Sequence, residues 1–181
     1  MSAKGFVPQG ECGSCVVCCE WLDIETEGLS KKAGILCSHC TGAGCGIYET
    51  RPSLCRGFHC GWRIIPKMGE DWRPDKSGVM ILIVEKDVPS QYDGANTGFN
   101  FVVIGGEKAV LRPGFSEYLS HLAACKIAVY LSANTPKTLI NEFLLPLVGN
   151  PAGTRQMLLH LYRLHIEAKK TGMVPKDQNG A

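Results

Sequence analysis

Apolar residues after position 62 first follow the pattern of β-strands. Two short runs, residues 79–84 and 100–104, are rich in β-branched and aromatic side chains and predict strands. Gly105-Gly106 after the second run predicts a turn into a further extended segment at residues 108–111. Together these segments predict a small antiparallel sheet.

Residues 113–172 then follow the pattern of helices. Apolar side chains at positions 115, 118, 119, 122, 123 and 127 lie on one face of a helix predicted over residues 115–131. Thr135-Pro136 predicts the start of a second helix, because a capping residue is followed by a first-turn proline. Pro146 predicts the end of that helix or a kink in it.

A longer helix is predicted near the end of the chain. Asn150-Pro151 repeats the start signal, and Gly172 marks the exit. Lys169 and Lys170 fall in the last turn, where the helix dipole favours cations. The apolar positions of this helix are Met157, Leu158, Leu161, Leu164 and Ile166.

The first 61 residues show little periodicity and are rich in cysteine and glycine. Nine of the ten cysteines lie between Cys12 and Cys60, and Cys125 stands apart. Five basic and six acidic residues give this segment a charge of −1, and the remaining 14 basic and 11 acidic residues give +3. A segment of this composition buries little apolar surface, so we expect bound metal to supply the missing folding free energy.

Composition excludes several classes of protein. The chain has 181 residues, of which 45% are hydrophobic and 20% charged, and this is ordinary usage for a folded protein of one domain or one core with a small appendage. The net charge of +2 offers no electrostatic footprint for nucleic acid or an anionic membrane. No apolar run reaches 18 residues, and the first ten residues lack the apolar core of a secretory signal. We therefore expect a cytoplasmic protein whose cysteines bind metal rather than form disulfides.

Cysteine spacing defines two candidate groups of ligands. Residues 12–19 read CxxCxxCC, and a spacing of two residues lets a chain curl so that successive sulfurs converge on one centre. A second group from a distant segment supplies the partners that a closed four-ligand site requires. The nine candidate metal ligands are Cys12, Cys15, Cys18, Cys19, Cys37, Cys40, Cys45, Cys55 and Cys60.

These motifs resemble those of the YkgJ-type cysteine-cluster family, which is described as zinc- or iron-chelating. The resemblance covers roughly residues 12–63, where CxxCxxCC is followed by a later cysteine and by CGIYETRPSLCRGFHC at 45–60. It implies that eight cysteines are ligands, with Cys37 as an addition or as a replacement for Cys40. The family's own function is poorly defined, so the resemblance implies metal binding and no particular reaction.

Three metal arrangements remain open from the sequence. Cys12, Cys15 and Cys18 can hold three corners of a [4Fe–4S] cluster, with Cys55 or Cys60 as the fourth ligand. Alternatively, the pair Cys12-x2-Cys15 joins Cys37-x2-Cys40 in a zinc site, and the remaining cysteines form a second zinc site. In the third arrangement a cluster and a zinc site coexist, because eight thiolates suffice for both. The cluster is slightly favoured over zinc alone.

Other polar residues near the motif are candidates for supporting roles. Tyr48, Arg51 and Arg56 are candidate contacts to a substrate or cofactor, and packing and carbonyl hydrogen bonding are the favoured structural alternative. His39 and His59 are expected beside the site or on the surface rather than as ligands. We expect a small apolar lid made of Phe58, Trp62 and Trp72. Cys125 is expected to pack inside its helix. Three further histidines are expected to lie on helix surfaces or to be partly buried: His121, His160 and His165.

We therefore predict an α+β protein. A cysteine-rich, metal-stapled module at residues 1–63 is expected to pack on a small antiparallel sheet and C-terminal helices at residues 64–181, forming one compact unit. The predicted function is that of a metal-binding protein, and if it is an enzyme, a redox reaction or electron transfer to a protein partner is the expected chemistry. A non-enzymatic zinc module that holds an interaction surface, and metal storage or delivery, are the alternatives. The sequence leaves the substrate and the oligomeric state open.

Overall fold

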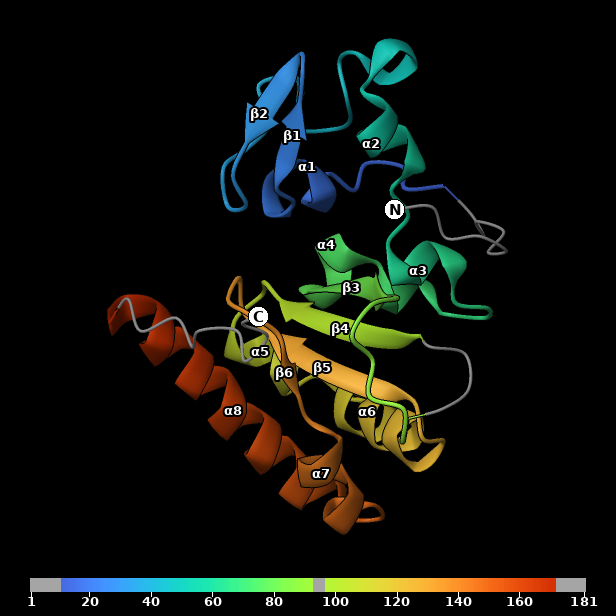
Figure 1. Cartoon of the computed structure of the whole chain (residues 1–181), viewed down its shortest axis with the longest axis vertical. Helices are drawn as coiled ribbons and strands as arrows, with labels where there is room; N and C mark the ends of the chain where they lie inside the picture. The colour runs from blue at the N-terminus through green and yellow to red at the C-terminus, as the bar shows by residue number, and fades with distance from the viewer. Residues whose placement is uncertain (1–10, 93–96, 172–181) are drawn as a thin grey trace. The chain divides into compact units, whose positions relative to one another are not determined.

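The computed structural model describes residues 11–92 and 97–171. The chain divides into two compact units, one ending at Met80 and the other beginning at Ile81. The first unit takes in the predicted cysteine module and continues beyond it. Each unit is described by itself (Figure 1).

Short elements joined by loops make up the first unit. Strands β1 and β2 form an antiparallel hairpin in which Ile24 lies opposite Lys31. A separate antiparallel bridge joins Cys40 to Cys45. The elements are α1 (Val17–Trp21), β1 (Ile24–Thr26), β2 (Leu29–Lys31), η1 (Tyr48–Thr50), α2 (Ser53–Gly57), α3 (Gly61–Ile64), η2 (Glu70–Trp72) and α4 (Pro74–Ser77).

The cysteine-rich part of this unit has almost no hydrophobic core. Between residues 11 and 60, the buried residues are Ile24, Lys31, Cys37 and Cys60. Burial of apolar surface is the main favourable contribution to folding, so this segment receives little of it. Hydrogen bonds and turns therefore contribute a larger share of the interactions in this segment.

A four-stranded sheet with the order β3-β4-β5-β6 organises the second part of the chain. Strands β4 and β5 are parallel, with Phe99 opposite Val129, whereas β5 and β6 are antiparallel. The elements are β3 (Val79–Val84), β4 (Gly98–Val103), α5 (Glu107–Val110), α6 (Phe115–Ala124), β5 (Ala128–Ser132), β6 (Thr138–Leu139), α7 (Asn141–Leu144), η3 (Leu145–Leu147) and α8 (Pro151–Thr171).

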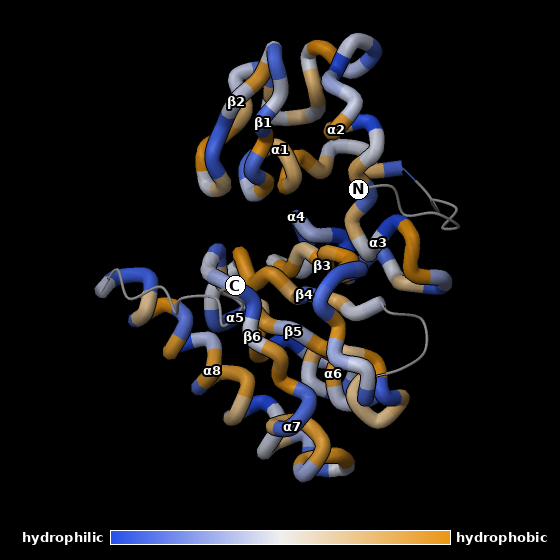
Figure 2. Tube along the Cα trace, in the orientation of Figure 1, coloured by the Kyte–Doolittle hydropathy of each residue, from blue (hydrophilic) through white to orange (hydrophobic). Residues whose placement is uncertain are grey.

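The hydrophobic core of the second unit lies between this sheet and its helices. Helices α6 and α8 both contact β5, and Figure 2 shows hydrophobic and hydrophilic residues alternating along α8. The ring of Phe101 on β4 meets that of Phe115 on α6 edge to face, with the centroids 5.9 Å apart. Asn141 is fully buried: its side-chain oxygen accepts a hydrogen bond from the Val129 N–H at 2.8 Å, and its amide group donates to the Ile127 carbonyl at 2.8 Å. These two bonds fix the start of α7 against β5.

The α+β class, a small sheet with antiparallel pairing and the C-terminal helices confirm the prediction from sequence, but the sheet of the second part of the chain also contains the parallel pair β4 and β5. Strand β3 has the predicted bounds, β4 lies within two residues of its prediction, and α8 begins at Pro151 as expected. Lys169 and Lys170 occupy its last turn, and Gly172 lies outside the described residues. Within the described ranges, no helix is both long enough and apolar enough to cross a bilayer.

Three element predictions were wrong. The helix predicted over 115–131 ends at Ala124, and residues 128–132 form β5, because a continuous apolar run fits a fully buried strand as well as a helix. Residues 108–111 fall mostly in helix α5 instead of a strand, since a connection between parallel strands must cross over the sheet. Thr135 starts no helix: its hydroxyl accepts a hydrogen bond from the Ala133 N–H at 3.2 Å, and the next helix begins only at Asn141.

Candidate metal-binding site

The nine cysteines of the predicted motif all lie in the first unit and fall into two groups. All ten cysteines of the chain are free thiols. The CxxCxxCC motif is divided, because Cys18 and Cys19 line a pocket whereas Cys12 and Cys15 interact with Cys60. The first two of the three metal arrangements combined cysteines that the structure assigns to different groups.

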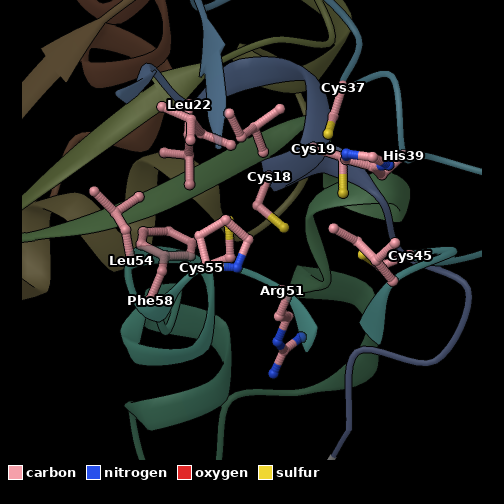
Figure 3. A pocket seen from close by; sticks show the side chains of 14 residues that line it. Cys18, Cys19, Leu22, Cys37, His39, Cys45, Arg51, Leu54, Cys55 and Phe58 are labelled. Atoms are coloured by element: carbon pink, nitrogen blue, oxygen red, sulfur yellow. The ribbon is translucent and has the colours of Figure 1, made fainter. Parts of the chain in front are cut away.

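Five thiols from three separate segments line one pocket, which we call the sulfur pocket (Figure 3). Helix α1 supplies two of them, the loop after β2 supplies two, and helix α2 supplies one. The cysteines of the sulfur pocket are Cys18, Cys19, Cys37, Cys45 and Cys55, accompanied by His39 and Arg51. Apolar side chains complete its wall: Leu22, Ile24, Leu29, Ile47, Pro52, Leu54 and Phe58.

Backbone hydrogen bonds bring the first two of these segments together. The Cys37 N–H donates to the Cys19 carbonyl at 2.9 Å, which places the loop after β2 against the end of α1. The Cys40 N–H then donates to the Cys37 carbonyl at 2.9 Å, so the CxxC sequence there forms a tight turn. The bridge from Cys40 to Cys45 closes a hairpin, whose tip includes Gly42 with a φ of +83°.

Lys31 fixes the other side of α1. This lysine is 8% exposed, and its ammonium group donates to the Glu20 carbonyl at 3.0 Å and to the Leu22 carbonyl at 2.5 Å. Both carbonyls lie at the C-terminal end of α1, where a helix lacks internal donors for its last carbonyl groups. Lys31 therefore positions the short helix that carries Cys18 and Cys19.

Crowding of thiols dominates the electrostatics of the pocket. A hydrogen bond to Cys18, burial and the charge of Cys18 together raise the pKa of Cys19 far above its usual range, and a hydrogen bond from Cys40 and the charge of Lys31 act in the opposite direction. Burial is the largest cause of the raised pKa of Cys55, followed by the charges of Cys37, Cys19 and Cys45, with Arg51 lowering it. Cys40 thus belongs with the sulfur pocket although it does not line it.

The remaining three thiols form the second group. The Cys15 N–H donates to the Cys12 carbonyl at 3.0 Å, in a turn where Gly13 has a φ of +55°. Cys60 is 8% exposed, and its pKa is raised to about 11 by burial and by the charges of Cys12 and Cys15, with the N–H groups of Arg63 and Trp62 lowering it. We call Cys12, Cys15 and Cys60 the Cys60 group.

The ligand atoms that line the sulfur pocket determine whether it suits a metal. Across residues 11–92 and 97–171, no three side chains of histidine, cysteine, aspartate or glutamate stand in an arrangement that holds a metal ion. The pocket nevertheless offers the donors that zinc and iron–sulfur clusters use, since thiolate sulfur is a ligand for both and imidazole for zinc. A rotation about a single bond in each side chain moves a thiol sulfur while the backbone stays in place. The donor set therefore fits such a metal.

The other predicted site residues take different places. Arg51 lines the sulfur pocket, and its guanidinium carbon lies 3.9 Å from the centroid of the Tyr48 ring, which is 55% exposed. Arg56 is exposed in the last turn of α2 and does not line the pocket. His39 does line it, whereas the Nδ1 of His59 lies 3.2 Å from the guanidinium of Arg63.

Two residues with clear roles were missed by the sequence analysis. Lys31 carries no signal in the cysteine spacing, because its role depends on the hairpin that turns it toward α1. Asp75, whose carboxylate interacts with Cys15, lies 15 residues beyond the last cysteine of the motif. Spacing rules apply to neighbouring ligands and cannot find such a distant carboxylate.

Residues outside the motif are placed as follows. The prediction that Cys125 packs inside a helix was wrong: it is exposed after the last residue of α6, and its sulfur lies 3.8 Å from the Nε2 of His121. His121 and His160 are exposed and His165 is partly buried, as expected. Among the predicted lid residues, Phe58 lines the sulfur pocket and Trp72 is partly buried. Trp62 is buried, and its indole N–H donates to the Gly69 carbonyl at 3.0 Å.

The resemblance of the cysteine motif to the YkgJ-type family stays a prediction. Comparison of the chain with protein-family models, with curated proteins and with solved structures gave no match.

Proposed function

We propose that the sulfur pocket binds a metal–thiolate centre, with a [4Fe–4S] cluster as the first candidate, and that this centre organises the cysteine-rich segment. One observation carries the proposal: five thiols from three segments line a single pocket. A sixth thiol, that of Cys40, interacts with Cys19 at its edge. Six sulfurs exceed the four that a closed site of either kind needs.

The distribution of the thiols supports the cluster. The thiolate ligands of a [4Fe–4S] cluster bind different iron atoms, so they stand around the walls of a cavity instead of meeting at one ion. The sulfur pocket has its cysteines on such walls, with Leu22, Leu54 and Phe58 among the apolar residues between them. Apolar surroundings restrict the access of water, which is one of the factors that set the reduction potential of a cluster.

Positive groups beside the pocket suit an anionic centre. Arg51 lies in the wall, and its Nε is buried without a hydrogen-bond partner among the described residues. A guanidinium N–H is a good donor to anionic acceptors. Lys31 adds a second positive charge near Cys19. Both cations favour thiolates over thiols, as a bound metal requires.

Scarcity of buried apolar residues gives the centre a structural role. Only four residues between 11 and 60 are buried, and two of these are cysteines. In small cysteine-rich modules, the free energy of metal binding contributes directly to folding. We infer that the metal centre takes the place of a hydrophobic core in this segment.

The chemistry of the bound centre follows from its type. A cluster would supply one-electron transfer, and we extend the proposal to a protein redox partner that exchanges that electron. We further propose that the protein works in the cytoplasm, because ten free cysteines fit a reducing compartment.

Zinc is the second candidate, and one feature favours it. The CxxC turn at Cys37 and Cys40, closed by a 2.9 Å hydrogen bond, has the two-residue spacing of zinc-binding turns. A zinc centre would hold the segment in place without redox chemistry, as a binding module or in metal storage and delivery. Exchange of the metal with the fold retained would favour storage.

Anaerobic purification of the full chain tests the proposal. We expect a brown protein with iron and acid-labile sulfide, whereas a colourless protein with stoichiometric zinc would establish the second candidate. The variant C19S/C37S/C55S/H39A removes one pocket thiol from each segment and the pocket imidazole, and it leaves three of six thiols, so it should lose the pocket metal. The matched control is C125S, which removes the exposed cysteine of the other unit. Equal metal in the quadruple variant and the control, or no metal in the wild type after reconstitution, would contradict the proposal.

A further inference from the structure

The Cys60 group has a fourth candidate ligand that lies outside the cysteine motif. The carboxylate of Asp75 accepts a hydrogen bond from the Cys15 thiol, and the backbone N–H of Asp75 donates to the Cys15 sulfur. Two cysteines of the group, Cys12 and Cys60, interact electrostatically with Cys15. Cys15 thus links three sulfurs and one carboxylate in the first unit. Among the described residues these four side chains do not stand in an arrangement that holds a metal ion, so a bound ion requires rotations about their side-chain bonds.

The carboxylate is held in a fixed orientation. Arg73 donates to the two oxygens of Asp75, from Nε at 2.7 Å and from Nη2 at 2.9 Å. Each carboxylate oxygen has two lone pairs, so this bidentate contact leaves acceptor capacity for a further partner. Outer groups that hold a ligand in this manner are a regular part of metal sites.

Backbone N–H groups are directed at two sulfurs of the Cys60 group. Those of Val17 and Asp75 interact with Cys15, and those of Trp62 and Arg63 interact with Cys60. Burial raises the pKa of both thiols, and these N–H groups act against it. Outer hydrogen-bond partners of this kind also orient the ligands of metal sites.

The turn that carries Cys12 and Cys15 also lies close to the arginine. Gly13 has a φ of +55°, and a Cβ at that position would lie 3.8 Å from the Nη1 of Arg73. A left-handed residue between the two cysteines lets the chain curl back, and glycine adopts that conformation without strain. The loop, the arginine and the carboxylate therefore form one connected arrangement.

We propose that Cys12, Cys15, Cys60 and Asp75 form a second metal site, separate from the sulfur pocket, that takes a single zinc-type divalent ion with three sulfur ligands and one oxygen ligand. Zinc accepts both cysteine sulfur and aspartate oxygen in tetrahedral sites. Three thiolates and one carboxylate around a divalent ion leave a net charge of −2, which Arg73 beside Asp75 partly offsets. This inference adds a second centre to the proposed function but does not require the pocket metal to be a cluster.

Metal stoichiometry of complementary variants tests the proposal. Full-length C12S/C60S, reconstituted with zinc, should bind one equivalent fewer than the wild type. The pocket variant C19S/C37S/C55S/H39A should retain one zinc equivalent. Retention of all wild-type zinc by C12S/C60S would overturn the second site, whereas retention of all wild-type metal by the pocket variant would overturn only the proposed function.

Asp75→Asn in the pocket variant tests the oxygen ligand. Loss of an outer hydrogen-bond partner commonly lowers metal affinity about 10-fold to 100-fold, so removal of a direct ligand should lower zinc affinity by at least that factor. Cobalt(II) in place of zinc gives a second readout, because its visible spectrum reports the ligand set. D71N, which neutralises an exposed carboxylate nearby, is the control. Equal zinc affinity and an unchanged cobalt spectrum in D75N and D71N would show that Asp75 is not a ligand.

Discussion

Replacing Lys31 tests whether the sulfur pocket depends on the positioning of α1. The Lys31 ammonium group donates to the carbonyls of Glu20 and Leu22, so K31M keeps the length of the side chain while removing both hydrogen bonds. It also removes the positive charge that lowers the pKa of Cys19. We expect α1 to detach from the hairpin and metal binding to weaken.

The magnitude follows from the two hydrogen bonds. Hydrogen bonds from a charged donor contribute about 1.5–3 kcal/mol each, and the two carbonyls regain part of this from water because they are only partly buried. A total loss of about 2–4 kcal/mol is therefore expected for the folded state of this segment. If metal binding and folding of the segment are coupled, that loss corresponds to a decrease of about 30-fold to 1,000-fold in apparent metal affinity.

Chelator competition on the full-length, metal-loaded protein measures this change. K32M is the matched control, because Lys32 is the exposed neighbour and its replacement alters the net charge equally. Amide hydrogen exchange in peptides that cover α1 and β2 should rise in K31M and stay unchanged in K32M. Equal chelator resistance in the two variants would refute the positioning role of Lys31.

The remaining predictions concern metal removal and the second unit. Metal removal by a chelator should increase amide hydrogen exchange across residues 11–60 and leave α8 protected. An equal loss of protection from exchange in both regions would contradict a metal-dependent fold limited to the first segment. N141A leaves the Val129 N–H and the Ile127 carbonyl unpaired, so it should destabilise the second unit by about 2–5 kcal/mol in urea unfolding followed by circular dichroism, and a loss below 1 kcal/mol would count against it. Burial lowers the pKa of His165 below its usual 6.5, so the unfolded state binds more protons near pH 6, and the free energy of unfolding should fall more steeply from pH 7 to pH 5 in the wild type than in H165Q. Identical slopes in the wild type and H165Q, with H160Q as control, would exclude this contribution.

Strong local patterns in the sequence predicted individual elements well. The run at β3 and the start of α8 at Pro151 carry signals that depend on neighbouring residues alone. The apolar run that forms β5 begins one residue after Lys126, where the conformation changes with a φ of +57°. Hydrophobic periodicity carries no information about such a change, because it results from pairing with β4.

The candidate site was predictable in its residue types and not in its grouping. Spacing identified the cysteines of the motif, yet it left open whether Cys15 and Cys18 share one centre. Their separation depends on long-range contacts, such as that of Cys15 with Asp75 and that of Cys19 with Cys37. Contacts between distant segments have no counterpart in local spacing, so the grouping required the structure.

Helical geometry explains why the CxxCxxCC motif divides where it does. Neighbouring side chains point to opposite sides in a strand but are about 100° apart in a helix, so the adjacent Cys18 and Cys19 on α1 can both line one pocket. Cys15 precedes the first residue of α1 and belongs to the turn that contains Gly13. The two residues between Cys15 and Cys18 are therefore where the chain passes from turn to helix. The same spacing that in other proteins brings sulfurs to one centre here separates the sulfur pocket from the Cys60 group, and the start of α1 at Val17 determines which thiol belongs to which group.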